Sequence, residues 1–189
     1  TERLIQQYAT TTGHEIPHGR ADLLDILKTY PVKNGAQFEE ILVGLNGISP
    51  RLYTIASSPA AHEGEVHIVV VKDTFIANDK KRFGICSDFL SKLKLNSTQQ
   101  FFVQPNKRFR LPAENKDIIM VGPGTGIAAF RSFLAERDAT GASGRNWLFF
   151  GEQHFASDFL YQTEIQNWHE TGVLTNINLA FSRAQKEKI

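Results

Sequence analysis

"IIMVGPGTGIAAF", Ile118 to Phe130, is the stretch that decides the fold. An apolar run is followed first by a glycine-rich turn and then by a helical pattern; the turn contains Gly122, Gly124, Thr125 and Gly126. Backbone N–H groups ahead of a helix form an anion site, and glycines let a pyrophosphate approach the backbone closely. A plain strand-to-helix turn is the alternative, because glycine supplies positive φ at any bend. The spacing is neither G-x-G-x-x-G nor a P-loop, so spacing alone leaves both interpretations open.

The residues after this turn predict a parallel sheet. Strands are expected at 118–122, 146–151 and 176–182, with helices at 127–138 and 157–170. Alternation of strand and helix favours parallel strands joined by right-handed crossovers. The carboxyl ends of such strands lie at one edge of the sheet, where ligands bind in open α/β folds.

Upstream, the pattern changes twice. Residues 1–48 carry helical periodicity, with helices expected at 21–31 and 36–45. From Ile48 the chain is rich in β-branched and aromatic residues, which predicts strands at 51–59 and 65–75 and a strand pair within 101–112. We therefore expect three segments: 1–48 helical, 49–112 β, and 113–189 α/β.

Composition excludes several classes of function. With 189 residues and 41% apolar side chains, the chain can bury a core. A net charge of +1 gives no basic footprint for nucleic acid, and no apolar run is long enough to span a bilayer. The single cysteine, Cys86, excludes an internal disulfide and fits a reducing compartment, so we expect a cytoplasmic protein. Since the chain starts at Thr1 without Met, we expect a piece of a longer polypeptide.

Sequence motifs also argue against two kinds of catalytic site. The six histidines are dispersed, without H-E-x-x-H spacing, so no metal site is expected. No G-x-S-x-G elbow is present, which argues against a serine hydrolase.

Polar residues follow the third expected strand. Ser182 and Arg183 end it, and Lys186 and Lys188 come directly after. A hydroxyl, a guanidinium and ammonium groups at the carboxyl edge of a sheet suit a phosphomonoester, although a solvated basic turn is the alternative. Glu152, after the second strand, would instead suit a ribose 2′-hydroxyl, as in NAD sites. The basic group favours the 2′-phosphate of NADP.

Two further motifs suggest a second nucleotide. "RLYT", Arg51 to Thr54, places a cation and an aromatic ring on one strand face and a hydroxyl on the other. The cation suits a pyrophosphate and the ring of Tyr53 a planar heterocycle, although a half-buried strand aromatic is the alternative. In "FGICSDFL", Gly84 to Ser87 opens a predicted helix whose N–H groups and serine hydroxyl suit another phosphate.

These motifs carry a resemblance. "RLYTIASS", "GICSDFL", "FRLP", "VGPGTGIAAFR", "NWLFFGEQHFASDFLYQTEIQNW" and "FSRAQKEKI" occur in the order seen in the diflavin reductases. Among these the chain resembles the flavoprotein (alpha) components of NADPH-dependent sulfite reductases, with cytochrome P450 reductase more distant. The resemblance implies a ferredoxin-NADP reductase-like fold of mixed α/β and β class. Its parts are a helical connecting segment (1–48), part of an antiparallel β-barrel FAD domain (49–112) and part of a Rossmann-like NADP domain (113–189).

The implied activity is an NADPH-dependent reductase. Hydride would pass from NADPH to FAD, and electrons would leave through a flavodoxin-like FMN domain of the parent chain to a sulfite reductase haemoprotein. A ferredoxin- or flavodoxin-type NADP reductase is the first alternative, although such enzymes lack the helical segment. A nucleotide-binding fragment without turnover is the second. We expect no nucleic-acid or membrane partner.

The resemblance also implies roles for individual residues. Arg51 would contact the FAD pyrophosphate, and the expected catalytic residues are Tyr53, against the isoalloxazine ring, and Thr54, near flavin N5. The other expected FAD contacts are Leu52, Val69, Val70, Val71, Phe75, Gly84, Ile85, Cys86 and Ser87. The expected NADPH contacts are Gly122, Gly124, Thr125 and Gly126 at the pyrophosphate and Ser182, Arg183 and Lys188 at the 2′-phosphate.

The chain departs from the family pattern in places. Thr54 replaces the usual serine, and Ala129 replaces the usual proline after "GIA". The family's first barrel strands, its later Y-V-C-G-D strand and its terminal aromatic residue are absent from the sequence. Cys86 does not match the family's catalytic cysteine, and a small buried residue is its simpler interpretation.

Overall fold

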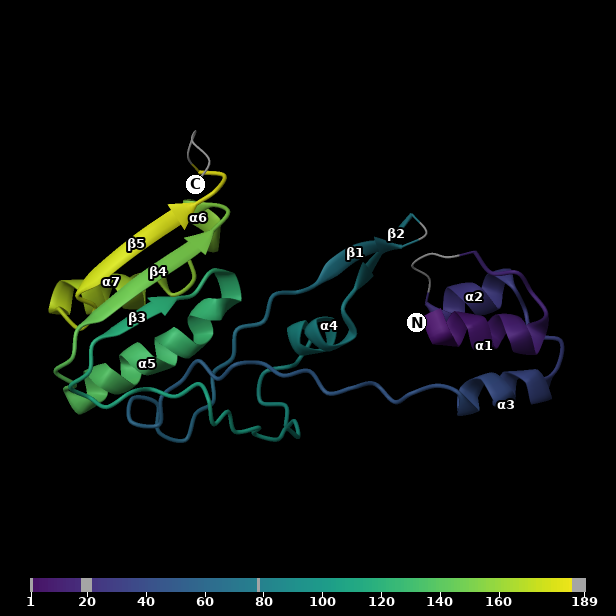
Figure 1. Cartoon of the computed structure of the whole chain (residues 1–189), viewed down its shortest axis with the longest axis horizontal. Coiled ribbons are helices and arrows are strands. Elements are labelled where there is room, and N and C mark those ends of the chain that lie inside the picture. Colours follow the sequence, from purple (N-terminus) through teal and green to yellow (C-terminus); the bar gives the residue numbers. More distant parts are fainter. Residues whose placement is uncertain (1, 18–21, 78, 185–189) are drawn as a thin grey trace. The chain divides into compact units, whose positions relative to one another are not determined.

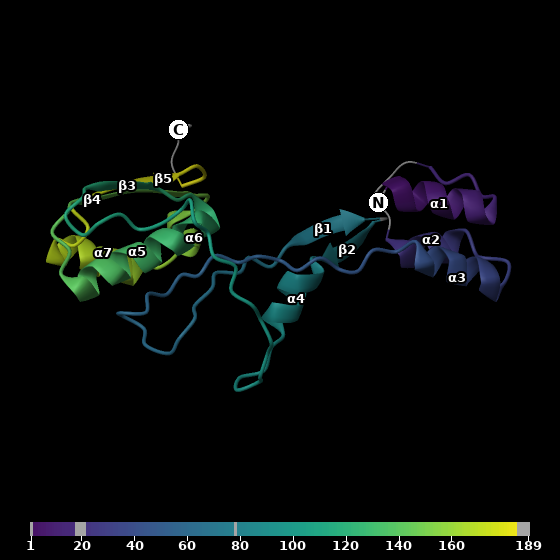
Figure 2. The same ribbon diagram turned by 60° about the horizontal axis from the view of Figure 1, so that its bottom comes forward.

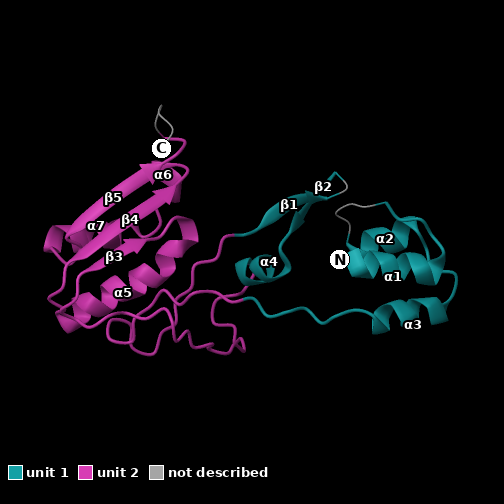
Figure 3. Cartoon of the chain, in the orientation of Figure 1, with its two compact units in different colours: residues 1–51, 72–91 teal, residues 52–71, 92–189 magenta. Residues whose placement is uncertain are grey.

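The structure, a computed structural model, describes residues 2–17, 22–77 and 79–184. The chain forms two compact units, shown in Figure 3: unit 1 contains residues 1–51 and 72–91, and unit 2 contains residues 52–71 and 92–189. Each unit has its own cluster of buried apolar side chains.

Unit 2 contains a three-stranded parallel sheet in the order β3-β4-β5 (Figure 1). Its strands are β3 (Ile118–Val121), β4 (Asn146–Glu152) and β5 (Asn176–Phe181). The connections are η1 (Gly124–Gly126) with α5 (Ile127–Thr140), and α6 (Phe155–Asp158) with α7 (Gln162–Thr171). The predicted β-α-β-α-β order and parallel sheet are therefore confirmed.

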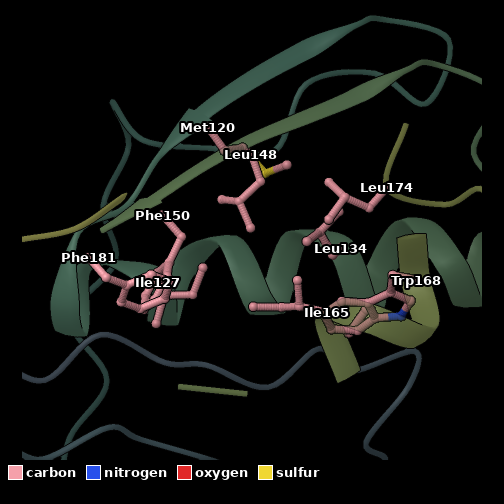
Figure 4. Close-up of a cluster of buried hydrophobic side chains, with 10 residues drawn as sticks. Met120, Ile127, Leu134, Leu148, Phe150, Ile165, Trp168, Leu174 and Phe181 are labelled. Atoms are coloured by element: carbon pink, nitrogen blue, oxygen red, sulfur yellow. The ribbon is translucent and has the colours of Figure 1, made fainter. Parts of the chain in front are cut away.

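The core of unit 2 lies between the sheet and its helices. Figure 2 shows α5 and α7 on the same face of the sheet. Leu148 and Phe150 of the central strand point to this face, because side chains alternate along a strand. They meet apolar residues of the helices and neighbouring strands in one cluster (Figure 4): Met120, Ile127, Leu134, Ala135, Ile165, Trp168, Leu174 and Phe181. Buried residues of both helices thus complete the core that the sheet begins.

The helix predicted at 157–170 is wrong in one respect, because the structure divides it into α6 and α7. Tyr161, between the two, has a left-handed φ of 56°. The ring of Phe159 stacks on Phe150, with centroids 5.2 Å apart, and lies 5.6 Å from that of Phe181. The helix is therefore interrupted at the place where the ring of Phe159 packs on the core.

Unit 1 begins with three helices, α1 (Glu2–Thr12), α2 (Leu23–Thr29) and α3 (Gly35–Val43). Tyr8, Ile26 and Ile41, one from each helix, are buried together. Asp22 and Asn34 cap α2 and α3, since their side chains accept hydrogen bonds from the N–H groups of Asp25 and Gln37. The two predicted helices are confirmed with shorter bounds.

Unit 1 also contains an antiparallel hairpin of β1 (Thr74–Ala77) and β2 (Lys80–Phe83), followed by α4 (Ile85–Ser91). The helix predicted to open at 84–87 is confirmed. The strands predicted at 51–59 and 101–112, and most of that at 65–75, are wrong for this structure. Outside β1 and β2, the described part of 49–112 has one isolated bridge, Ile55 to Ile68.

Within the described residues, this segment has no further strand to pair with. Two strands alone are marginally stable in water, and a stable sheet needs a third strand or packing against a helix. Val66, Ile68 and Val71 are 50%, 41% and 64% exposed. The β-rich composition of this segment is therefore not matched by strand pairing within the described chain.

We expect Leu148→Ala to destabilise unit 2 by about 2–5 kcal/mol, because it removes a fully buried side chain from the central strand. Leu95→Ala is the control, since Leu95 is 93% exposed and its loss should change stability by less than about 0.5 kcal/mol. Urea unfolding followed by tryptophan fluorescence measures this, because Trp147 and Trp168 both lie in unit 2. Equal effects of the two substitutions would contradict the assigned core.

Candidate functional site

The glycine turn follows β3 directly and leads into α5. The N–H of Gly122 donates to the carbonyl of Phe149 at 2.9 Å, which continues the sheet by one residue. The N–H of Gly126 donates to the carbonyl of Pro123 at 3.0 Å, which closes the short turn η1. Gly124 has a left-handed φ of 54°, a conformation that favours glycine. The turn therefore lies at the carboxyl edge of the sheet, at the start of a helix.

Gly122 is the tightest point of this turn. A Cβ atom there would lie 2.7 Å from the ring of Phe130 and 3.1 Å from the carbonyl oxygen of Gly126 and the nitrogen of Ile127. The helix therefore approaches the strand closely only because residue 122 has no side chain.

The rest of the turn fits a pyrophosphate. Thr125 and Gly126 are exposed, and a Cβ on Gly126 would meet only Pro123, at 3.8 Å. The N–H groups of Gly126 and Ile127 already donate to the carbonyls of Pro123 and Gly124, so an anion would meet the other N–H groups of the turn and the positive end of the helix dipole. The turn thus offers an open backbone surface beside a helix N-terminus.

A carboxylate lies against this turn. Oε1 of Glu152 is 3.1 Å from the position of a Cβ on Gly124, and Oε2 accepts the N–H of Gln153 at 2.9 Å. Glu152 ends β4, so it occupies the same edge of the sheet as the glycine turn. Its negative charge opposes a phosphate nearby and can accept a hydrogen bond from a ribose hydroxyl.

The residues after β5 reach this edge as well. The N–H groups of Ser182 and Arg183 donate to the carbonyls of Glu152 and Gln153 at 3.0 and 2.8 Å. Both side chains are exposed. Lys186 and Lys188 lie outside the described residues. The structure therefore brings together the glycine turn, Glu152, Ser182 and Arg183.

The residues expected at FAD are divided between the two units. Those in unit 1 are Arg51, Phe75, Gly84, Ile85, Cys86 and Ser87, and those in unit 2 are Leu52, Tyr53, Thr54, Val69, Val70 and Val71. Tyr53 is half-buried, whereas Arg51, Leu52 and Thr54 are exposed. The residues expected at FAD thus belong to both units.

The turn before α4 is compact. The N–H of Gly84 donates to the carbonyl of Asp73 at 2.9 Å, and the N–H of Asp73 donates to the hydroxyl of Ser87 at 3.1 Å. A Cβ on Gly84 would lie 2.9 Å from that hydroxyl oxygen. The hydroxyl itself donates to the carbonyl of Gly84 at 3.1 Å, so binding a phosphate through its proton requires this bond to open. Cys86 beside it is a half-buried free thiol.

An ion pair connects this turn to the helices of unit 1. The guanidinium of Arg82, in β2, donates to both carboxylate oxygens of Asp25 in α2, at 2.7 and 2.8 Å. Both bonds come from Nη2, and such charge-assisted hydrogen bonds are stronger than neutral ones. The hairpin that leads into Gly84 is therefore fastened to α2.

Sequence reasoning missed two buried cations of α5, namely Arg137, which is 1% exposed, and Arg131, which is 6% exposed. Arg131 donates to Glu164 of α7, to the carbonyl of Ala56 and to Nδ1 of His67. A signal was present, since Arg131 follows Ile127 by four residues and precedes Leu134 by three, which puts a charge in the apolar stripe of the helix. A charge in that position is buried only when it is paired.

Two other kinds of site are absent from the described residues. No helix there is both long and apolar enough to cross a membrane. No group of three or more His, Cys, Asp or Glu side chains in the same part of the chain is arranged to hold a metal ion.

The parallel sheet with a glycine turn after its first strand has the architecture of an open α/β domain. In agreement, residues 120–188 match the family described as "Oxidoreductase NAD-binding domain". Over 90% or more of its length the chain is similar to flavoprotein alpha-components of NADPH-dependent sulfite reductase, which confirms the resemblance seen in the motifs.

Three such relatives illustrate the match. The protein of Bacillus subtilis (strain 168) is 47% identical over all of this chain and 34% of its own length. That of Cronobacter sakazakii is 42% identical over all of this chain and 34% of its own length. That of Vibrio vulnificus is 46% identical over 90% of this chain and 28% of its own length. The chain thus spans about a third of the length of these curated relatives.

We expect Gly122→Ala to destabilise unit 2 by about 1–3 kcal/mol, because the added methyl group meets Phe130 and backbone atoms. Gly126→Ala is the matched control, since Gly126 has a helical φ of −60° and room for a methyl group. Urea unfolding of both variants measures the difference. A Gly126→Ala variant as unstable as Gly122→Ala would contradict this account of the turn.

Proposed function

We propose that this chain is part of a flavoprotein reductase that takes hydride from NADPH and sends electrons to a sulfite reductase haemoprotein. The observation that carries the proposal is the meeting of the glycine turn, Glu152, Ser182 and Arg183 at one edge of the sheet. Identity of 47% to a sulfite reductase flavoprotein over the whole chain supports the choice of reductase.

At NADPH, the backbone of Gly122, Gly124, Thr125 and Gly126 holds the pyrophosphate. Ser182 and Arg183, with Lys188, hold the 2′-phosphate by charge-assisted hydrogen bonds. Glu152 lies between these two sets along the edge. Its carboxylate accepts a hydrogen bond from a ribose hydroxyl, and its negative charge repels the phosphates from the end of β4. The protein's contribution here is position and charge.

At FAD, Arg51 would neutralise the pyrophosphate, Tyr53 would contact the isoalloxazine ring and Thr54 would offer its hydroxyl to the ring. Leu52, Val69, Val70 and Val71 would contact the ring, Phe75 would contact the adenine, and Gly84, Ile85, Cys86 and Ser87 would hold the phosphates. When bound, FAD supplies the redox chemistry, accepting hydride from NADPH and releasing electrons singly. These roles follow the family's motifs, and the compact turn at Gly84 is compatible with them.

For the domains, we propose 1–48 as the connecting segment, 49–112 as part of an antiparallel FAD barrel and 113–189 as the NADP domain. The bridge between Ile55 and Ile68 and the exposed Val66 and Val71 support the barrel, since both suit strands that pair with others. A flavodoxin-like FMN domain and the haemoprotein subunit are the proposed partners. The free thiol of Cys86 fits the cytoplasm as the proposed compartment.

A second candidate applies to the chain by itself, namely a nucleotide-binding module without turnover. The specific observation in its favour is that the described part of 49–112 outside the hairpin has a bridge in place of barrel strands. A ferredoxin- or flavodoxin-type NADP reductase is less consistent with the three helices of unit 1, a segment that simple reductases do not carry.

The first test is the choice of nucleotide. We expect NADP⁺ to bind more tightly than NAD⁺, and Arg183→Met to weaken NADP⁺ about 10- to 100-fold while leaving NAD⁺ unchanged, since hydrogen bonds to charged groups contribute about 1.5–3 kcal/mol. Arg145→Met is the control, because Arg145 also belongs to unit 2 and forms only an exposed ion pair with Asp117. Calorimetric titration measures both constants. Tighter NAD⁺ binding, or equal loss for both nucleotides, would contradict the assignment.

The second test separates the two candidates. The chain is mixed with FAD and desalted, and its visible absorption is recorded before and after addition of NADPH. Retained flavin bands that bleach with NADPH support the reductase. A colourless chain that still binds NADP⁺ supports the nucleotide-binding module and rules out FAD binding by this chain alone.

A further inference from the structure

One segment of unit 2, residues 55–68, lies against α5, and we call it the docked segment. Its ends are joined by the bridge between Ile55 and Ile68 and by the N–H of Ala56, which donates to the carbonyl of His67 at 2.8 Å. Between them, the hydroxyl of Ser57 donates to the carbonyl of Glu65 and accepts the N–H of His67, both at 3.1 Å. The docked segment is therefore a closed loop held by its own bonds.

Arg131 fastens both ends of this loop to α5. Its Nη1 donates to the carbonyl of Ala56 at 2.8 Å and to Nδ1 of His67 at 2.9 Å. Because a guanidinium only donates, Nδ1 of His67 must accept, which puts the ring proton on Nε2, 2.7 Å from a carboxylate oxygen of Glu65. Nη1 of Arg131 thus contacts both ends of the docked segment.

The remaining donors of Arg131 are held by α7. Nε and Nη2 bind the two carboxylate oxygens of Glu164 at 2.6 and 2.9 Å, and the guanidinium lies over the ring of Tyr161, 4.6 Å from its centroid. The hydrogen bond with Glu164 raises the pKa of Arg131, so the cation stays charged. Burial raises the pKa of the Tyr161 phenol, which stays neutral. The guanidinium is thus fixed in plane and in direction.

A second side chain of α5 supports the same contact. The hydroxyl of Ser58 donates to a carboxylate oxygen of Glu136, and the N–H of Ala60 approaches the same oxygen at 3.4 Å. Ser57 and Ser58 are both buried. The docked segment is therefore attached to α5 at two places, of which Arg131 is the one that also reaches α7.

The two ends of the docked segment lead to residues expected at the flavin. Thr54 immediately precedes Ile55, and Val69 immediately follows Ile68. In the other direction, α5 starts at the glycine turn, and Arg131 lies on its second helical turn. Arg131, together with Glu136, therefore holds the segment flanked by Thr54 and Val69 against the helix that starts at Gly122–Gly126, all within unit 2.

We propose that Arg131 is a positioning residue for hydride transfer, holding the flavin-side residues Tyr53, Thr54 and Val69 in register with the nucleotide-binding turn. The inference rests on the proposed function. Reacting groups must be aligned closely, and a misplacement of about 1 Å can slow a reaction about 100-fold. Arg131 touches neither nucleotide; it acts through the docked segment.

The first experiment uses hydrogen exchange on this chain and needs no cofactor. We expect Arg131→Met to speed exchange at the amides of Ala56 and His67 at least about tenfold, with β4 unchanged and NADP⁺ affinity within about twofold. Arg131→Lys, which keeps the charge but loses the planar set of donors, should give an intermediate exchange rate. Arg145→Met is the control and should change none of these. Unchanged exchange in the docked segment, or faster exchange throughout unit 2 with loss of NADP⁺ binding, would overturn the proposal.

The second experiment measures single-turnover reduction of the FAD-loaded chain by NADPH. We expect the rate in Arg131→Met to fall about 10- to 100-fold with unchanged NADP⁺ affinity and FAD content, and Arg131→Lys to recover part of it. Normal rates in both variants, with a working wild-type chain, would overturn this inference alone. A wild-type chain that holds FAD but is not reduced by NADPH would overturn the proposed function and, with it, the role in hydride transfer.

Discussion

The close approach of α5 to the end of β3 at Gly122 is the constraint on which the rest of unit 2 depends. The absence of a side chain lets Phe130 and the backbone of Ile127 come within contact distance of residue 122. This approach turns the chain from strand to helix in a few residues and leaves the glycine turn open at the carboxyl edge. It also directs α5 across the sheet, so that Ile127 and Leu134 complete the core.

Helix α5 contributes both to the candidate anion site and to the attachment of the docked segment. Its start offers backbone donors to an anion, and its second turn carries Arg131, which reaches the docked segment and α7. Along the carboxyl edge, the charges are opposite, with Glu152 beside the glycine turn and Arg183 after β5. An extended dinucleotide with separate phosphate and ribose groups suits this alternation better than a single phosphate does. The site and the docked segment thus depend on one element.

Much of unit 2 could be predicted from the sequence because its signals are local. Strand and helix periods, with the handedness of parallel crossovers, were enough to place Gly122, Glu152 and Arg183 on one edge. The strands predicted at 51–59 and 101–112 do not form in this structure, since a strand forms only with partners that the local pattern does not show. The break at Tyr161 depends on the stacking of Phe159 on Phe150. The hydroxyl of Ser87 is occupied because it accepts the N–H of Asp73. Both are contacts between residues that are not neighbours in the sequence. Arg131 was detectable as a charge in an apolar stripe.

The measurement that tests the central claim most directly is amide hydrogen exchange of this chain with and without NADP⁺. The account predicts slower exchange at Gly124–Ile127 and at Ser182 and Arg183 when NADP⁺ is present, with the turn at Gly84–Ser87 unaffected. The glycine turn and residues 182–183 are far apart in the sequence, and they meet at the carboxyl edge of the sheet. Protection confined to Gly84–Ser87, or no change at the glycine turn at saturating NADP⁺, would contradict the account.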